Sequence, residues 1–523
     1  MHFVSCTNDL REYLDLAGAK NINFSNISTD TRSMSKDALF IAIKGPNFDG
    51  NKFIDQAFDN GAVAVLTSDT QYKNNTNPAC IYVPSVKEAL IQIATRICDE
   101  FKGKKILITG SNGKTTCTFL LSHSLPNCSS TIENFNNEIG LPLSVMQADR
   151  DSEYLVLEAG AGKPGDIAIL SEIVKPHLGL ITSISESHTE FLGNLEGVFN
   201  EKTSMVKFIQ KGGDLIIGTE FEEGHPLNAK LKSLQELSSK KNNIFINLVE
   251  LNLRFLSADE TDPLRATDSY DYWKECVVNF SKCMTNMQFK YWNPWGEDEF
   301  YESDFDSNLI GLHNIKNIIL VSKCLETLEV YDEDLKAILV SPIIKSLNRL
   351  EHLSWINGSH LINDSYNANP SSVKAAIELL CLASRKNFRR RIFVLGDMLE
   401  LKNPIESHVE VGNFIIRSAL EAWQNGIDSS IGAINKDHPN VSESVYSKFQ
   451  DAYIDVLITF GDFAEKVAQT VREKSLYKNV VECYVFESKT GEKKLIKFLK
   501  DFIEKDDIVI VKGSRGMRME RFI

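Results

Sequence analysis

The chain has 523 residues, of which 43% are hydrophobic and 24% charged, and this balance is typical of a folded globular protein. A chain of this length exceeds what one hydrophobic core supports, so we expect about three domains. Its 57 basic residues face 71 acidic ones, for a net charge of -14. Such a chain lacks the general basic field that nucleic-acid binding requires.

Cysteines and apolar runs bear on the cellular compartment. The ten cysteines occur singly, without a Cys-x-x-Cys pair, which disfavours a zinc or redox motif and fits free thiols in a reducing environment. The N-terminal residues reach charge too early for a signal peptide, and no stretch approaches the roughly 20 apolar residues that cross a bilayer. We therefore expect a cytoplasmic protein without a transmembrane segment.

The first region, residues 1–84, has the pattern of a small α/β module. Apolar runs at residues 38–43 and 62–66 predict strands, and residues 53–61 predict a short helix that ends at a glycine. A turn-rich loop, Lys44-Gly-Pro-Asn-Phe-Asp-Gly50, precedes that helix. A periodic apolar segment at residues 85–101 predicts a helix that leads into the next domain.

A phosphate-binding motif follows early in the second region, residues 85–346. The apolar run at residues 105–109 predicts a strand, and Gly110-Ser-Asn-Gly-Lys-Thr-Thr116 comes directly after it. The two glycines let backbone N–H groups approach an anion, Lys114 neutralises the outer phosphates of a nucleoside triphosphate, and Thr115 offers a hydroxyl to Mg²⁺. The strict P-loop pattern has a further glycine where this chain has Ile108, so the motif alone leaves a chance glycine turn open.

Two further apolar runs, at residues 154–158 and 178–184, alternate with helical stretches and predict a mainly parallel sheet. Glu158 ends one run and His188 lies just past the other, at the edge where such sheets bind ligands. A solvated strand end and a merely structural histidine are the alternatives. Residues 220–307 show no clear period and are rich in aromatic residues, so we expect an ordered insertion there and assign it neither fold nor role.

The third region, residues 347–523, repeats the alternation of strands and helices. Apolar runs at residues 361–363, 391–395, 456–460 and 508–511 each end in a polar or glycine-containing loop. This pattern predicts a second doubly wound, Rossmann-like sheet. The predicted fold class is therefore α/β with three domains: the N-terminal module, a central P-loop-type ATPase domain and a C-terminal Rossmann-like domain.

Several segments taken together resemble the Mur ligases, the ATP-dependent amide-forming enzymes of peptidoglycan precursor synthesis. The phosphate motif alone would not separate them from folylpolyglutamate synthase. The far more specific matches are Asn134-Phe-Asn-Asn-Glu-Ile-Gly-Leu-Pro142, Ser365-Tyr-Asn-Ala-Asn-Pro370 and Lys512-Gly-Ser-Arg-Gly-Met-Arg518. Shorter matches occur in the family's order at residues 30–32, 44–50, 158–165, 311–314, 349–351 and 396–401.

The resemblance implies a ligase that uses ATP and Mg²⁺ for cell-wall biogenesis. The motifs are most similar to those of family members that join D-alanyl-D-alanine to UDP-N-acetylmuramoyl-tripeptide. In that reaction the tripeptide carboxylate attacks the γ-phosphate of ATP, and the dipeptide amine then displaces phosphate from the acyl phosphate. We expect a monomer whose partners are these two substrates.

The resemblance also implies roles for individual residues. Lys114, Glu158, His188 and Lys202 would be catalytic, and Thr115, Glu158, His188 and a carbamylated Lys202 would hold metal. Carbamylation needs a neutral amine and therefore a depressed pKa; without the family match, Lys202 reads as a lysine on a solvated helix face. The nucleotide would contact Gly110, Ser111, Asn112, Gly113, Lys114, Thr115, Thr116, Asn314 at the adenine, Arg349 near the γ-phosphate and Asp364 near the ribose.

The three residues proposed for the adenine, the γ-phosphate and the ribose could instead have structural roles. Asn314 could cap a helix, Arg349 could form a surface ion pair, and Asp364 could form an Asx-turn. For the substrates, the resemblance implies that the UDP part meets Asp30, Arg32, Lys44 and Asn47, the peptide meets Asn136 and Asn137, and the dipeptide meets Tyr366, Asn367, Asn369, Ser514 and Arg515. The planar guanidinium of Arg515 suits a terminal carboxylate, although a surface turn is an equal alternative.

The sequence also departs from the family pattern. Glu158-Ala-Gly-Ala-Gly-Lys163 stands where the family often has Glu-Met-Gly-Ala-Asn-His, which puts the substrate contacts near Lys163 in doubt. Two rival functions stay open: another Mur-type amino acid ligase, and a non-catalytic nucleotide-binding protein of the same descent. The first is the nearer alternative, although the Asp-Asn-Pro-Arg element expected of the diamino-acid-adding relative is absent. The second is disfavoured because Lys114, Thr115, Glu158, His188 and Lys202 are all present. The sequence also leaves open whether the third residue of the tripeptide is diaminopimelate or lysine.

Overall fold

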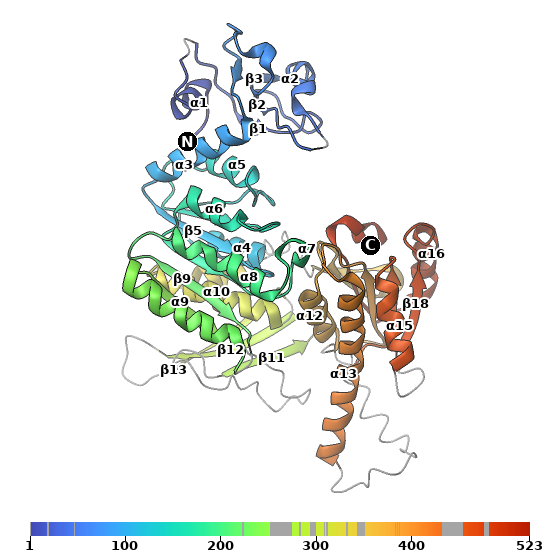
Figure 1. Ribbon diagram of the computed structural model, residues 1–523. Coiled ribbons are helices and arrows are strands. Elements are labelled where there is room, and N and C mark those ends of the chain that lie inside the picture. Colours follow the sequence, from blue (N-terminus) through green and yellow to red (C-terminus); the bar gives the residue numbers. More distant parts are fainter. Residues whose placement is uncertain are drawn as a thin grey trace.

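The computed structural model describes most of the chain, and the strands of the described residues form four sheets (Figure 1). Asn47 and Arg349, both predicted site residues, lie outside the described residues. Side chains are likewise not described at the edges of several elements or in the strands between residues 275 and 306. The described residues are 2–17, 20–46, 48–221, 224–250, 275–281, 284–292, 300–307, 309, 312–330, 333–341, 351–381, 383, 385, 387–430, 453–474 and 481–523.

The N-terminal module has a four-stranded parallel sheet in the order β1-β2-β3-β4. Its elements are α1 (Thr7–Tyr13), β1 (Asn26–Ser28), β2 (Ala38–Ile41), α2 (Ile54–Asp59), β3 (Ala62–Thr67) and β4 (Cys80–Tyr82). The strands predicted at residues 38–43 and 62–66 and the helix at 53–61 are confirmed with small changes of bounds. The predicted connecting helix is α3 (Val86–Glu100), whose N-cap Ser85 accepts from the Glu88 N–H.

The central sheet is parallel throughout, in the order β10-β9-β8-β5-β7-β6. Its strands are β5 (Lys104–Thr109), β6 (Cys128–Ser130), β7 (Tyr154–Glu158), β8 (Leu178–Ile181), β9 (Asp214–Thr219) and β10 (Phe245–Glu250). After β5 the chain forms β6 and β7 on one side of that strand, and then β8, β9 and β10 on its other side. The carboxyl end of β5 is therefore a topological switch point, where doubly wound sheets bind ligands.

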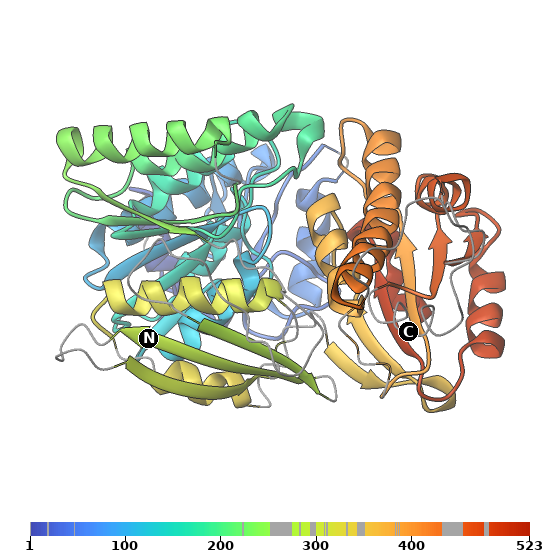
Figure 2. The ribbon, with the colours of Figure 1, turned by 90° about the horizontal axis from the view of Figure 1, so that it is seen from below.

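Helices cover both faces of the central sheet (Figures 1 and 2). One apolar cluster joins residues of α3, α5 and α6 to that sheet, and another joins α4, α10 and α11 to its other face. The helices are α4 (Lys114–Ser124), α5 (Gly140–Met146), α6 (Asp166–Val174), α7 (Thr189–Leu192), α8 (Leu195–Thr203), α9 (Pro226–Asn242), α10 (Leu312–Thr327) and α11 (Glu333–Val340).

The stretch at residues 220–307, which the sequence left without a fold, divides into two parts. Its first part supplies α9 and β10, and β10 pairs in parallel with β9 at the edge of the central sheet. Its second part forms a separate antiparallel sheet of β11 (Glu275–Ser281), β12 (Met284–Trp292) and β13 (Phe300–Ser307). Within the described residues of this stretch, β11, β12 and β13 thus form a sheet of their own.

The C-terminal region has a six-stranded sheet in the order β14-β15-β19-β16-β17-β18, parallel except for β14. Its strands are β14 (Glu351–Ser354), β15 (His360–Asp364), β16 (Arg391–Gly396), β17 (Val456–Phe460), β18 (Glu482–Phe486) and β19 (Ile508–Lys512). Its helices are α12 (Pro370–Cys381), α13 (Pro404–Ser430), α15 (Ala464–Lys474) and α16 (Glu492–Phe502). All four strands predicted in this region are confirmed.

Hydrophobic packing joins the first two regions and separates the third. One apolar cluster runs from the N-terminal sheet through α3 into the central sheet, including Leu66, Ile93 and Leu107. The C-terminal sheet has two clusters of its own, one on each face. Within the described part of the chain, no helix is both long and apolar enough to cross a membrane. The α/β fold with a central parallel sheet and a second doubly wound sheet is as predicted, whereas the domain limits at residues 84 and 346 stay a prediction.

Candidate active site

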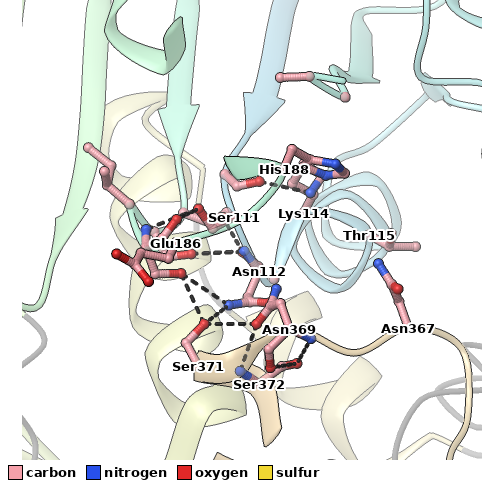
Figure 3. Close-up of a pocket in the computed structure, with 18 of the residues that line it drawn as sticks. Ser111, Asn112, Lys114, Thr115, Glu186, His188, Asn367, Asn369, Ser371 and Ser372 are labelled. Atoms are coloured by element: carbon pink, nitrogen blue, oxygen red, sulfur yellow. Dashed lines mark hydrogen bonds between the residues drawn. The ribbon is translucent and has the colours of Figure 1, made fainter. Parts of the chain in front are cut away.

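A cavity of about 1720 Å³ lies between the carboxyl edge of the central sheet and the start of α12 (Figure 3). It is lined by loops that follow β5, β7, β8 and β15, so residues from two domains face one space. Most of the predicted site residues line it: Gly110, Ser111, Asn112, Gly113, Lys114, Thr115, Thr116, Asn136, Asn137, Glu158, His188, Lys202, Asn314, Asp364, Tyr366, Asn367 and Asn369.

The two glycines of the phosphate motif are required by its geometry. Gly113 caps the N-terminus of α4 with a φ of 84°, a conformation that side chains other than that of glycine rarely adopt. A Cβ there would overlap Asn317 Oδ1, and a Cβ at Gly110 would overlap Thr182 Oγ1. The backbone thus passes too close to its neighbours for any other residue, and the helix begins with its N–H groups toward the cavity.

The serine-rich segment after β8 holds the phosphate loop in place. Ser111 Oγ donates to the Ser185 carbonyl oxygen at 2.7 Å, and the Asn112 N–H donates to Ser183 Oγ at 2.9 Å. Lys114 Nζ lies over the loop and donates to the Gly110 carbonyl oxygen at 2.8 Å. The lysine cation and the helix N-terminus therefore form an anion site before any ligand arrives.

Glu158 is the buried carboxylate at the end of β7, only 3% exposed. Asn136 Nδ2 donates to its Oε1 at 2.8 Å, and the Glu158 N–H donates to Thr131 Oγ1 at 2.7 Å. Among the residues that the structure describes, no three His, Cys, Asp or Glu side chains gather as a metal cage. Mg²⁺ suits such a site, because it binds through one or two protein oxygens together with phosphate oxygens and water.

Lys202 is a buried lysine at the end of α8, 2% exposed. Burial, and then the nearby Lys114 charge, lower the pKa of Lys202 well below its usual value, while Glu201 acts in the opposite sense. The Glu201 carboxylate already accepts two backbone hydrogen bonds, from the Gly165 N–H at 2.7 Å and from the Ile167 N–H at 2.8 Å. The alternative interpretation, a lysine on a solvated helix face, is therefore wrong for Lys202.

His188 contacts a residue that sequence reasoning did not single out, Glu400 of the C-terminal domain. His188 Nδ1 lies 2.9 Å from Glu400 Oε2, and both residues have positive φ, 51° and 61°. The contact lowers the pKa of Glu400. A histidine that donates Nδ1–H to a carboxylate keeps Nε2 as its basic nitrogen, which is the arrangement of many metal-binding histidines. The loop motif at residues 396–401 was the only sequence signal for Glu400.

Four polar residues join the central domain to the C-terminal domain, and we call them the interdomain link: Asn112, Ser185, Asn369 and Ser371. Figure 3 shows Asn112 beside Asn369 and Ser371. Asn112 Nδ2 donates to Ser371 Oγ at 2.7 Å, and Asn369 Nδ2 donates to Asn112 Oδ1 at 2.8 Å. Ser185 Oγ and Ser371 Oγ are 3.0 Å apart. Asn369 Oδ1 also accepts the Ser372 N–H at 2.8 Å, at the start of α12. The side-chain amide of Asn369, which was predicted to contact the dipeptide, is thus hydrogen-bonded to other groups of the protein.

The residues predicted to contact the adenine and the ribose, Asn314 and Asp364, both line the cavity and come from different domains. Asn314 is 4% exposed on α10 and accepts from Asn317 Nδ2 at 3.2 Å. Asp364 ends β15, and its carboxylate pairs with Lys512 Nζ at 2.5 Å. The same Nζ donates to the Asn367 carbonyl oxygen at 3.0 Å. Lys512 lines the cavity, and the sequence indicated it only as the first residue of a matching motif.

Five predicted substrate residues do not line the cavity. Asp30, Arg32 and Lys44 lie in the N-terminal module, where Arg32 pairs with Asp30 on the surface and Lys44 lies 3.7 Å from Asp49. Ser514 is buried, and its hydroxyl donates to the Ala368 carbonyl oxygen and accepts the Leu399 N–H. Arg515 is exposed, lies over the Tyr366 ring and pairs with Glu520 at 3.4 Å.

Comparison with known proteins identifies the class to which this fold and site belong. Three family models match the chain in order: the Mur ligase family catalytic domain over residues 23–98, the Mur ligase middle domain over 108–325, and the Mur ligase glutamate ligase domain over 348–515. The chain belongs to the Mur ligase family.

Particular members of the family are similar over nearly the whole chain. The UDP-N-acetylmuramoyl-tripeptide--D-alanyl-D-alanine ligase of Bacillus subtilis is 30% identical over 502 residues, covering 95% of this chain and 92% of that protein. The protein of the same name from Buchnera aphidicola subsp. Baizongia pistaciae is 31% identical over 440 residues, covering 83% of this chain and 85% of that protein.

Solved structures share the fold at lower identity. The MurF ligase of Thermotoga maritima, solved in complex with ADP, is 23% identical with a TM-score of 0.64 and covers 95% of this chain and 96% of that one. The UDP-N-acetylmuramoylalanyl-D-glutamyl-2,6-diaminopimelate--D-alanyl-D-alanyl ligase of Acinetobacter baumannii is 22% identical with a TM-score of 0.67, covering 99% of this chain and 96% of that one.

Proposed function

We propose that this protein is the ATP- and Mg²⁺-dependent ligase that joins D-alanyl-D-alanine to UDP-N-acetylmuramoyl-tripeptide, giving the pentapeptide precursor of peptidoglycan, ADP and phosphate. Relatives of that name align over 95% and 83% of the chain at 30% and 31% identity. The observation that carries the proposal is the single cavity in which the phosphate loop, Glu158, His188 and Lys202 meet Asp364 and Tyr366 of the other domain.

The residues of the cavity suit a reaction between anions. The tripeptide carboxylate must approach the γ-phosphate of ATP, so the site needs positive charge more than a protein nucleophile. Lys114 and the N-terminus of α4 supply that charge at the phosphates. Mg²⁺, held by Thr115 and Glu158, would neutralise further charge on the phosphate oxygens.

Lys202 is suited to become a second anionic ligand near the metal. The low pKa of its amine keeps a neutral fraction available at neutral pH, and only a neutral amine adds carbon dioxide to form a carbamate. The carbamate would place a negative charge at the end of the Lys202 side chain, near the cation of Lys114. His188, oriented by Glu400, would hold metal through Nε2.

The substrates would be bound at both ends of the site. Asp30, Arg32 and Lys44 would bind the UDP part in the N-terminal module, and Asn136 and Asn137 would meet the peptide at the cavity wall. Tyr366 and Asn367 line the cavity on the side proposed for the dipeptide, with Arg515 directly behind the Tyr366 ring. Arg349, outside the described residues, would approach the γ-phosphate.

We propose that the protein acts in the cytoplasm as a monomer. ATP and nucleotide-linked precursors are the substrates of the proposed reaction, and the eight cysteines whose side chains the structure describes are free thiols.

One assay tests the function. The purified chain is incubated with ATP, Mg²⁺ and UDP-N-acetylmuramoyl-tripeptide, and phosphate release is measured with and without D-alanyl-D-alanine. We expect release that depends on the dipeptide. Release that depends instead on a single amino acid would favour another Mur-type ligase, and no release with any amino acid or dipeptide would favour a non-catalytic nucleotide-binding protein.

A further inference from the structure

A glutamate carboxylate and a lysine ammonium face the cavity, and neither has a role in the proposed mechanism. Glu138 and Lys163 both line the cavity, and Lys163 Nζ lies 3.9 Å from Glu138 Oε1. Behind them Lys87, in the first turn of α3, holds Glu138 Oε2 at 2.7 Å. Lys163 is also the position at which this chain departs from the family pattern.

The two residues are held at fixed places relative to the reaction centre. Glu138 follows Asn136 by two residues, so its Cα lies within about 7 Å of the Cα of Asn136, whose side-chain amide bonds Glu158. The Gly160 N–H donates to the Asn136 carbonyl oxygen at 2.7 Å, which ties the Glu138 loop to the Lys163 loop. Asp166 Oδ2 accepts the N–H groups of Gly162 and Lys163, each at 2.9 Å.

The Lys163–Glu138 pair contributes little to folding. Its separation is long, and the lysine side chain is 58% exposed, so water screens the attraction. Lys163 can therefore leave Glu138 for a ligand at small cost. Two opposite charges that are weakly paired at a cavity wall suit a ligand that carries both an ammonium and a carboxylate.

Large apolar side chains are also open to the cavity. Ile169, one turn into α6 from the Lys163 loop, is 38% exposed, and Phe191 on α7 is 56% exposed, yet both line the cavity. Large apolar side chains open to a cavity favour a ligand with an aliphatic chain. The wall as a whole thus fits a short methylene chain that ends in a zwitterion.

We propose that Glu138 and Lys163 bind the far end of the side chain of the acceptor's third residue, and that they select a diamino-dicarboxylic acid such as diaminopimelate over lysine. Lys163 would bind the distal carboxylate and Glu138 the distal ammonium, with Lys87 as a positioning residue for Glu138. The proposal rests on the proposed function, because the reacting carboxylate of the same residue must lie beside Glu158. A lysine side chain would satisfy Glu138 alone.

The test compares two acceptors, UDP-N-acetylmuramoyl-tripeptides that end in diaminopimelate or in lysine, with the whole chain and its Lys163→Met and Glu138→Gln variants. The KM values for acceptor and for ATP are measured by phosphate release. We expect Lys163→Met to raise the KM for the diaminopimelate acceptor by roughly tenfold and to leave that for the lysine acceptor unchanged, since one charged hydrogen bond is lost. Glu138→Gln should raise the KM for both acceptors, and the KM for ATP should stay constant throughout.

Lys230→Met is the matched control, because Lys230 forms a surface ion pair with Glu196 and does not line the cavity. Unchanged acceptor KM values in Lys163→Met would overturn the proposal. Equal increases for both acceptors would also overturn it, because Lys163 would then bind a carboxylate that both peptides share. If the unaltered chain shows no turnover, the proposed function fails, and calorimetric binding of the two acceptors to the same variants still decides this inference.

Discussion

At the scale of single residues, Lys202 is the side chain whose environment most constrains its chemistry. Its amine is 2% exposed and shares the cavity with Lys114. We expect Lys202→Ala to lower the rate of dipeptide-dependent phosphate release on the order of 100-fold, because a preorganised anion beside the phosphates is lost. Short carboxylates such as acetate should restore part of the rate. Undiminished activity of the variant would contradict the proposed role.

Lys105 offers a matched control for that experiment. It is also a buried lysine, 3% exposed, with a pKa lowered by burial, but its Nζ donates to the Cys98 carbonyl oxygen and it does not line the cavity. We expect Lys105→Ala to lower the thermal unfolding midpoint and to leave the turnover of the folded fraction unchanged. Acetate should have no effect on this variant.

His177 predicts a pH dependence of stability. Its Nδ1 accepts the Lys105 N–H at 3.0 Å, and burial followed by the charges of Lys105 and Lys104 lowers the pKa of His177 from 6.5 to about 4. Between these values the unfolded chain binds a proton that the folded chain does not, so the free energy of unfolding rises with pH through this window. Urea unfolding at several pH values should show the rise. His177→Asn, which keeps an acceptor without titrating, should show a smaller one; an equal slope would contradict the assignment.

At the scale of elements, the start of α4 depends on the backbone of Gly113. We expect Gly113→Ala to raise the KM for ATP more than about tenfold, because the new Cβ displaces Asn317 and with it the N-terminus of α4. Gly165→Ala is the control, since Gly165 has a similar φ of 94° at the start of α6 but nothing within 4 Å of a Cβ. That variant should lose about 1–2 kcal/mol of stability and keep its KM for ATP. Equal effects of the two changes on the KM would refute the steric argument.

At the scale of the whole molecule, the type of contact between domains predicts which of them moves. A continuous apolar cluster joins the N-terminal module to the central sheet, whereas the contacts described here between the phosphate loop and the C-terminal domain are polar. Polar interfaces within a chain are readily opened. We therefore expect the C-terminal domain to open and close over the cavity, with the interdomain link favouring the closed state.

Asn112→Ala removes the centre of that link. We expect a larger average domain separation by fluorescence energy transfer between labels on the central and C-terminal domains, and a lower kcat, because closure assembles the site. Asn357→Ala is the control, since Asn357 Nδ2 donates to the Lys500 and Ile503 carbonyl oxygens, both within the C-terminal domain. An unchanged separation in Asn112→Ala would show that the link does not hold the domains together.

Local sequence patterns were sufficient to predict much of the fold. The strands at residues 154–158, 391–395 and 456–460 agree with the structure to within a residue, because buried parallel strands are short apolar runs bounded by polar loops. The strands β6 and β14 were missed, since they are short edge strands without such runs. The antiparallel sheet of β11, β12 and β13 was missed because its stretch shows no clear period.

The sequence by itself determined the chemistry available at each loop: a glycine-bounded turn with Lys114, a carboxylate at Glu158, and the motifs that place the chain among the Mur ligases. Only the tertiary structure decided which of these groups act together. Lys202 became a buried amine of low pKa, Asn369 was committed to Asn112, and Glu400 was brought to His188 across a domain boundary. The physical reason is that desolvation and hydrogen bonding depend on neighbours distant in sequence, and no local pattern encodes those neighbours.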